Sequence, residues 1–149
     1  MNSNQKGFTF LELLITLAMI SIFTVCTLQT YQHTRKQYAL QHVTQQLITT
    51  LQNAQVHASV LQQAMQLTPL ENNWKNGWVL CAKKRCLPWV RLHKRLVNIS
   101  WRGFDAKHSV SVYPAGDFHQ MNGRFTLQTN HPALVQQIVL NQVGRIRVV

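Results

Sequence analysis

The stretch Lys6-Gly7-Phe8-Thr9-Phe10-Leu11-Glu12 opens an apolar run that continues to about Leu28. Between Phe8 and Leu28 the only charged side chain is that of Glu12. About twenty apolar residues in helical conformation are enough to cross the hydrocarbon core of a bilayer. The run therefore predicts a membrane-spanning helix over residues 8–30.

The residues before this run do not fit an ordinary secretory signal, which has a shorter apolar region and a small-x-small cleavage site soon after it. Here a short polar leader ends in Lys6-Gly7, an aromatic residue comes next, and Thr9-Phe10-Leu11-Glu12 continues the motif. This junction resembles the type III signal of type IV pilins and pseudopilins. The resemblance implies that a prepilin peptidase removes residues 1–7 by cleaving after Gly7, and that the new terminus at Phe8 is N-methylated.

Glu12 is the residue that a plain membrane anchor does not explain. An ionisable carboxylate inside an apolar helix costs a few kcal/mol and usually has a partner or a purpose. In pilins, the glutamate five residues in from the cleavage point is assigned to pairing with the N-terminal amine of a neighbouring subunit, so the resemblance implies a role in filament assembly. The alternative is that Glu12 lies near the helix end and reaches the lipid headgroups.

Length and charge limit the size of the remaining domain and the kinds of partner that it favours. Of 149 residues, roughly 115 remain after the leader and the membrane helix, enough for one small core. The chain has 15 Lys and Arg against 4 Asp and Glu, a formal net charge of +11. Such a basic part favours polyanions as partners, namely nucleic acid, anionic lipid or lipopolysaccharide. A charge that only keeps an envelope protein soluble is the alternative.

The helical pattern continues beyond the membrane segment. Apolar residues recur at alternating three- and four-residue steps, at Leu40, Val43, Leu47, Leu51, Ala54, Ala58, Leu61 and Met65. This pattern predicts that the helix runs through Met65, with residues 31–68 as an amphipathic continuation into a soluble head, and that Pro69 stops it. A coiled coil has similar spacing, but the flanking positions are Gln and Thr without complementary charges, which favours core packing.

After Pro69 the pattern changes to short β-like runs separated by turn residues. It predicts strands at 78–81, 88–92, 97–102, 109–113, 124–129, 136–140 and 145–149. Residues 69–149 are therefore expected to form a β-rich globular head. The expected fold class is α+β, a long N-terminal helix packed on an antiparallel sheet, which matches the type IV pilin plan.

Four tryptophans are expected among the core or edge aromatics of this head, at positions 74, 78, 89 and 101. Large aromatic side chains bury much area in small domains. The alternative is a platform on which the bases of a single strand stack between cations.

The cysteines indicate the redox compartment. Cys26 lies in the apolar run, whereas Cys81 and Cys86 are separated by only four residues. If the membrane helix exports the residues C-terminal to it, this pair lies in an oxidising periplasm, where a short disulfide is the expected state. A zinc site would need two further ligands at compatible spacing, so no metal is expected.

The head resembles the group of minor pilins and minor pseudopilins that includes the GspH and FimT types. The matching elements are Asn76-Gly77-Trp78-Val79, Tyr113-Pro114-Ala115-Gly116, Gly123-Arg124-Phe125-Thr126-Leu127 and Gly144-Arg145-Ile146-Arg147-Val148. A Gly-Arg-x-Arg tail is associated with FimT-type minor pilins that bind DNA during natural transformation. The resemblance therefore implies double-stranded DNA as a partner, bound at Gly144, Arg145 and Arg147.

The physics of an extended tail is consistent with that role. Arg145 and Arg147 would point to one side about 6.6 Å apart, while Ile146 and Val148 would point to the other. Two guanidiniums can then bind successive phosphates, and Gly144 allows a tight turn. The alternative is an edge strand protected by charge against aggregation. Further candidate cations are Lys83, Lys84, Arg85 and Arg124, with Arg91, Lys94, Arg95 and Arg102 also available.

Catalysis has little support, because the seven histidines are scattered and no nucleophile motif is present. No enzyme activity and no cofactor are expected. The sequence predicts a single-pass protein of the bacterial inner membrane with its head in the periplasm, which then joins a pilus or pseudopilus with other major and minor pilins. The alternative function is a structural minor pilin or pseudopilin of a type IV pilus or type II secretion system, which primes or caps the filament without binding DNA.

Overall fold

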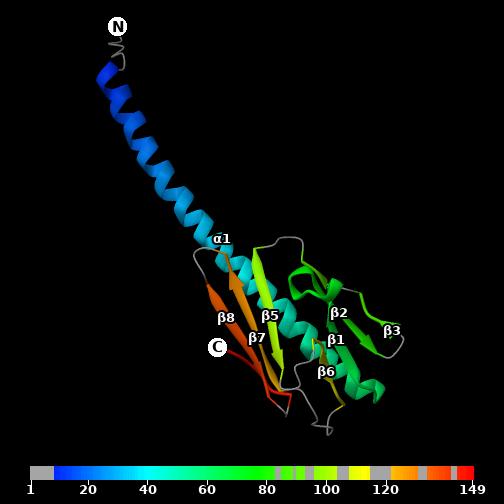
Figure 1. Cartoon of the computed structure of the whole chain (residues 1–149). Helices are drawn as coiled ribbons and strands as arrows, with labels where there is room; N and C mark the ends of the chain where they lie inside the picture. Colours follow the sequence, from blue (N-terminus) through cyan, green and yellow to red (C-terminus); the bar gives the residue numbers. More distant parts are fainter. Residues whose placement is uncertain are drawn as a thin grey trace, which may run out of the picture. The chain divides into compact units, whose positions relative to one another are not determined.

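Figure 1 shows the computed structural model of the chain. It describes residues 9–82, 85–88, 90–92, 96–103, 108–114, 122–130, 134–141 and 144–149, with the side chains of residues 26 and 29 excepted. The chain divides into two compact units, Met1–Arg35 and Lys36–Val149. The long helix α1, Phe10–Leu61, contributes to both units, and the second is called the folded unit.

In the first unit α1 is apolar and uncovered. Large hydrophobic side chains along residues 10–28 are exposed, for example Phe10 at 77% and Phe23 at 71%. The hydroxyl groups of Thr16, Ser21, Thr24 and Thr27 donate hydrogen bonds of 2.7–2.9 Å to carbonyls of their own helix. Polar groups satisfied within the helix are what a hydrocarbon environment requires. By length and composition, α1 is able to cross a membrane.

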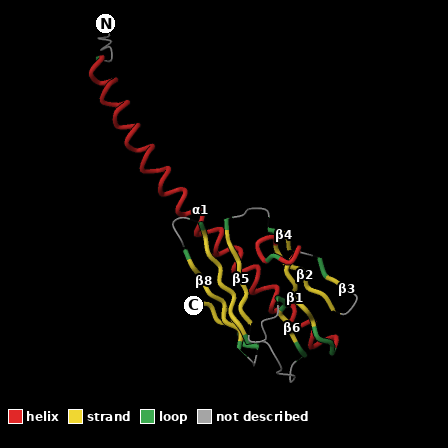
Figure 2. The backbone as a smooth tube through the Cα atoms, viewed as in Figure 1, coloured by secondary structure: helices red, strands yellow, loops and turns green. Residues whose placement is uncertain are grey.

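The folded unit has two antiparallel sheets (Figures 1 and 2). The first has the strand order β3-β2-β1-β6, and β4 also pairs with β2. Its strands are β1 (Met65–Pro69), β2 (Gly77–Ala82), β3 (Arg85–Cys86), β4 (Val90–Arg91) and β6 (Val110–Val112). The second sheet has the order β5-β7-β8-β9. Its strands are β5 (Val97–Gly103), β7 (Gly123–Thr129), β8 (Val135–Leu140) and β9 (Ile146–Val148).

One hydrophobic core joins α1 to both sheets. The helix stripe contributes Leu47, Leu51, Ala54 and Ala58, all at 0% exposure. The strands contribute a larger set of buried side chains that includes Leu67, Trp78, Val112, Phe125, Leu127, Ile138 and Leu140. The prediction that this stripe packs on a β-rich unit is confirmed.

Polar contacts fix the helix against the sheets. The indole Nε1 of Trp78 on β2 donates to Thr50 Oγ1 at 3.1 Å, and Thr44 Oγ1 donates to Gln136 Oε1 on β8 at 2.9 Å. Because buried polar groups must be paired, these bonds favour one position of the helix over the sheets.

The end of the helix differs from the sequence prediction. We expected helix through Met65, but α1 ends at Leu61 and Met65 begins β1. Gln62 has φ +48°, in the left-handed region, and the N–H of Gln63 donates to the carbonyl of Ala58 at 3.2 Å. This is the six-to-one bond of a Schellman end, formed without glycine. The step from Leu61 to Met65 fitted the helical spacing, while the alternation of Met65 and Leu67 is that of a strand.

The other strands lie close to their predicted positions, except that β1 and β3 were missed and that β4, β6 and β9 are shorter than expected. Two short 3-10 helices, Leu70–Asn72 and Trp74–Asn76, link β1 to β2.

The predicted disulfide is present, because Cys81 and Cys86 are direct partners across β2 and β3 and their sulfur atoms are bonded. Residues 83 and 84, between these cysteines, lie outside the described residues.

Replacing Leu51 by Ala tests the contact of the helix with the sheets. We expect Leu51→Ala to lower the free energy of unfolding by about 2–5 kcal/mol, because it removes a fully buried side chain and leaves a cavity. Val56 lies on the same helix at 60% exposure, so Val56→Ala should change stability by less than about 0.5 kcal/mol. Thermal and urea unfolding of the full chain in non-ionic detergent measure both, and equal effects would contradict the assigned core.

Candidate nucleic-acid interface

Strand register brings three arginines into one line across the second sheet. Arg102 on β5 is the direct partner of Arg124 on β7, Arg124 is the partner of Val139 on β8, and Val139 is the partner of Arg147 on β9. Directly opposed residues of an antiparallel sheet point to the same face. Arg102, Arg124 and Arg147, called the arginine row, therefore share a face and are all exposed.

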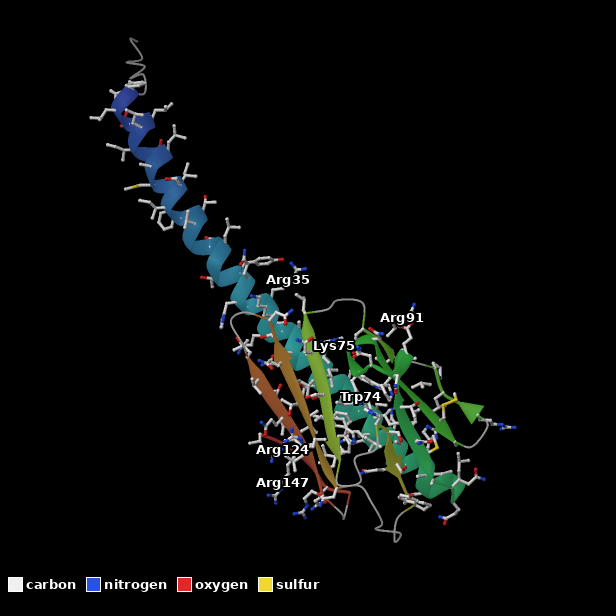
Figure 3. The ribbon with its side chains drawn as sticks, in the orientation of Figure 1. Arg35, Trp74, Lys75, Arg91, Arg124 and Arg147 are labelled. Carbon is white, nitrogen blue, oxygen red and sulfur yellow. A yellow bond between two sulfur atoms is a disulfide. The ribbon has the colours of Figure 1, made fainter. Side chains whose placement is uncertain are left out.

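That face is the outer one. The neighbouring line of partners, Trp101, Phe125 and Ile138, belongs to the core side, and alternation turns the arginine row the other way. Figure 3 shows Arg124 and Arg147 close together near one end of the second sheet. The face of the second sheet opposite the core is called the outer face.

The turn between β8 and β9, called the tail turn, places a fourth arginine, Arg145, beside the row. Gly144 donates its N–H to the carbonyl of Asn141 at 3.0 Å, and the N–H of Asn141 donates to the carbonyl of Arg145 at 3.2 Å. Gly144 has φ +75°, in the left-handed region that favours glycine. Arg145 is exposed and lies two residues before Arg147. Ile146, between them, is half-buried against the core, so Arg145 and Arg147 both lie on the opposite side of the chain from Ile146.

α1 also contacts this turn. Gln55 Nε2 donates to the carbonyl of Gly144 at 2.6 Å. A Cβ atom at position 144 would stand 3.0 Å from the same Nε2. Gln55 therefore positions the start of the tail relative to the helix, a contact that sequence reasoning missed because 89 residues separate the two partners.

A hollow of about 670 Å³ lies on the outer face. Besides Arg102 and Arg124, its lining includes the polar residues Ser100, Thr126 and Gln137. Ser100 and Thr126 are cross-strand partners, as are Thr126 and Gln137, so they form a neutral line two residues along the strands from the arginine row. Hydroxyl and amide groups beside guanidiniums are able to bind phosphate oxygens.

The outer face is strongly positive. Among the described residues the acidic side chains are Glu12, which is in the first unit, and Glu71, which lies in the 3-10 turn after β1. Glu71 contacts Arg91 at 3.7 Å and accepts a hydrogen bond from Asn76. No ion pair to any arginine of the outer face is found in this described part of the chain. Like charges directly opposed across strands destabilise a sheet, so Arg102 and Arg124 favour an anionic partner.

The N-terminal site is built around Glu12. Glu12 Oε2 accepts from the backbone N–H of Thr9 at 3.1 Å and from its hydroxyl at 3.2 Å, while Thr9 Oγ1 accepts from the N–H of Glu12 at 3.3 Å. This reciprocal pattern is a capping box, which satisfies amide groups at the start of a helix. The predicted cleavage and methylation sites, Gly7 and Phe8, lie outside the described residues.

Comparison with known protein families shows to which family this chain belongs. A family model for the prokaryotic N-terminal methylation motif matches residues 2–25. A second model, for the type II transport protein GspH, matches residues 43–144 of the 149. The chain belongs to the GspH family. The predicted resemblance to type IV pilin-like minor pilins and pseudopilins is therefore confirmed.

Solved structures agree on the fold of this GspH-family chain. A crystal structure of the type IV minor pilin FimU from Pseudomonas aeruginosa is 16% identical, with a TM-score of 0.61 over 76% of this chain and 90% of FimU. A second crystal form of FimU is also 16% identical, with a TM-score of 0.52 over 73% of this chain and 91% of that one. At this identity the likeness supports the α+β pilin fold alone. A comparison with curated protein sequences finds no match.

The other candidate cations of the GspH-family chain are distributed differently. Arg85 is exposed on β3 in the first sheet, away from the arginine row in the strand order. Arg91 on β4 contacts Glu71. Lys83, Lys84, Lys94 and Arg95 lie outside the described residues. Among the described cations that the sequence analysis named, Arg102 and Arg124 are the ones that share the outer face with Arg145 and Arg147.

The described tryptophans pack mainly in the core, and Trp101 also contributes to the lining of the hollow. Trp74 and Trp78 are buried, and Trp74 packs edge-on against Phe125 with ring centroids 5.0 Å apart. Trp101 also packs against Phe125, with ring centroids 4.4 Å apart, and its ring lies against Gly103 and Gly123. Trp89 lies outside the described residues. No three His, Cys, Asp or Glu side chains gather as metal ligands within the part of the chain that is described.

The tail turn provides a test of this geometry. We expect Gly144→Ala to lower the free energy of unfolding by roughly 1–2 kcal/mol, because an L-residue is strained at φ +75°. Gly144→Asn should lose less, since asparagine tolerates the left-handed region. Thermal unfolding of the full chain measures the difference, and equal stability of both variants and the parent would contradict the assigned turn.

Proposed function

We propose that this protein is a minor type IV pilin whose head binds double-stranded DNA without sequence preference and aids DNA uptake in natural transformation. The observation that supports the proposal most strongly is the meeting of the tail arginines, Arg145 and Arg147, with Arg124 on one exposed face. Guanidinium groups bind phosphate in bidentate geometry and remain charged at any physiological pH. Lys83, Lys84 and Arg85 are proposed as further DNA-contacting cations, with Arg85 on the first sheet and apart from this face.

The chemistry of the face favours recognition of the DNA backbone. Phosphate contacts fix a protein on DNA but carry no sequence information, which suits uptake of DNA from any source. Counterions released from the phosphates make such binding strongly dependent on salt.

The N-terminal segment gives the proposed location. Residues 8–30 anchor the protein in the bacterial inner membrane with the head in the periplasm, prepilin peptidase cleaves after Gly7, and Phe8 is methylated. The mature chain then enters a filament with other major and minor pilins, where Glu12 sets the register. Repetition of the tail along or at the tip of a fibre would raise a weak single-site affinity.

Removing the tail charges tests DNA binding. We expect Arg145→Gln with Arg147→Gln to weaken binding of a random-sequence duplex on the order of ten- to hundredfold, because each lost charge-assisted contact contributes about 1 kcal/mol or more. The slope of log affinity against log salt should fall in magnitude by about 2. A gel-shift or fluorescence-anisotropy titration of the full chain in non-ionic detergent, from about 50 to 200 mM salt, measures both quantities.

Two outcomes would overturn parts of this proposal. Unchanged affinity in the double variant would remove the tail from the site. No binding by the parent at low salt would favour the structural role, a minor pilin or pseudopilin that primes or caps a filament, for which membership of the GspH family is the supporting observation. A deletion strain that loses piliation or secretion but keeps normal DNA uptake would favour that role as well.

Glu12 has two proposed contributions that substitutions separate. Glu12→Gln keeps an acceptor for the capping box, since glutamine also occupies that position in helix caps, but removes the charge. Glu12→Ala removes both. If the carboxylate pairs with a neighbouring amine, incorporation into filaments should fall severalfold in both variants while membrane insertion is retained, as measured by immunoblotting of sheared filaments and membranes. Normal incorporation of Glu12→Gln would reduce Glu12 to a helix cap.

A further inference from the structure

We infer that DNA is bound across the strands of the second sheet, with one phosphate backbone running along the arginine row from Arg102 through Arg124 to Arg147. The inference rests on the proposed function and extends it from the tail to the body of the sheet. It assigns roles to Arg102 and Val139, which sequence reasoning did not place together.

The first argument is geometric. Neighbouring strands lie about 4.8 Å apart, so the row spans three strand spacings, or roughly 14 Å, between Arg102 and Arg147. Successive phosphates along one backbone are farther apart than the axial rise of about 3.4 Å, so the row matches a few consecutive phosphates of one strand. Arginine occupies three of the four positions in this line, and Val139 fills the remaining one.

The second argument concerns the residues beside the row. Ser100, Thr126 and Gln137 form a parallel neutral line in the hollow of the outer face, and they add uncharged donors to phosphate oxygens. Arg145 lies on the other side of the row, two residues before Arg147. The positive charge is therefore concentrated in a band across the strands and does not run along any single strand.

The third argument concerns the repulsion between neighbouring arginines and the position of the Trp101 ring. Arg102 and Arg124 are direct cross-strand partners, and no acidic residue of the described chain lies on this face. A bound phosphate backbone would remove the resulting repulsion. The ring of Trp101 packs against Phe125 on the core side, and Trp101 also contributes to the lining of the hollow beside Arg102 and Arg124. The partner that fits is the backbone of a duplex.

Charge-removing variants of the full chain in non-ionic detergent provide the first experiment, with a random-sequence duplex as the probe. We expect Arg102→Gln with Arg124→Gln to weaken binding at least tenfold and to reduce the magnitude of the salt slope by about 2. The matched control is Arg35→Gln with Lys75→Gln, which removes the same charge from exposed positions outside the second sheet. The control should change affinity by less than about threefold, because neither residue belongs to the second sheet and exposed charges are screened by salt.

A gain-of-charge variant provides a second experiment that loss of folding cannot imitate. Val139→Arg adds a guanidinium between Arg124 and Arg147, so it should strengthen duplex binding severalfold and raise the magnitude of the salt slope by about 1. Gln52→Arg adds the same charge at an exposed position on α1 and should leave the slope unchanged. Without DNA, Val139→Arg should lower the melting temperature, and duplex should restore part of the loss.

The outcomes separate the two proposals. If the parent binds duplex and the tail variant is weakened, but the Arg102 and Arg124 variant matches its control and Val139→Arg matches Gln52→Arg, the arginine row is overturned and tail binding stands. If the parent does not bind duplex at low salt, the proposed function itself fails. Tighter binding of a single strand than of a duplex of equal length would overturn the assignment of the duplex backbone as the partner.

Discussion

Burial of one stripe of α1 beneath both sheets is the constraint on which the folded unit depends. Leu47, Leu51, Ala54 and Ala58 are fully buried, and the small alanines allow backbone elements to approach closely. An antiparallel sheet needs only one covered face, and its other face remains in water. Once the helix has covered the inner face of the second sheet, alternation leaves Arg102, Arg124 and Arg147 on the outer one.

The same constraint links the helix to the tail. Gln55 lies on α1 three residues before the buried Ala58, and its amide donates to the carbonyl of Gly144. Gly144 belongs to the turn that places Arg145 and Arg147 at the edge strand β9. The position of the tail is therefore set by packing in the core, together with the local preference of glycine for its turn.

The sequence predicted the secondary-structure elements more reliably than their arrangement in space. The apolar stripe and the alternation around Val110 and Val112 encode local periodicity, which is why the helix and most strands lie where they were expected. The end of α1 was misplaced because Met65 satisfies the helical spacing and the strand alternation equally well, and because Gln62 adopts a left-handed conformation that usually belongs to glycine.

The arginine row could not be predicted because it depends on strand order. Arg102 and Arg124 are separated by 22 positions in the chain, and Arg147 lies 23 further on, so neither spacing carries a local signal. Only the order β5-β7-β8-β9 and its register make them neighbours. The tail motif was visible in the sequence because its arginines are two residues apart, a distance at which alternation alone places side chains on one face.

The most direct test of the account is to observe the arginine side chains while duplex DNA is added. In the full chain with labelled arginine, the Nε–Hε resonances of Arg102, Arg124, Arg145 and Arg147 should shift together on titration with a short duplex. Those of Arg35 and Arg91, which lie outside the outer face, should remain in place. Shifts confined to Arg35 and Arg91, or no shift at low salt where electrostatic binding is strongest, would contradict a DNA-binding outer face.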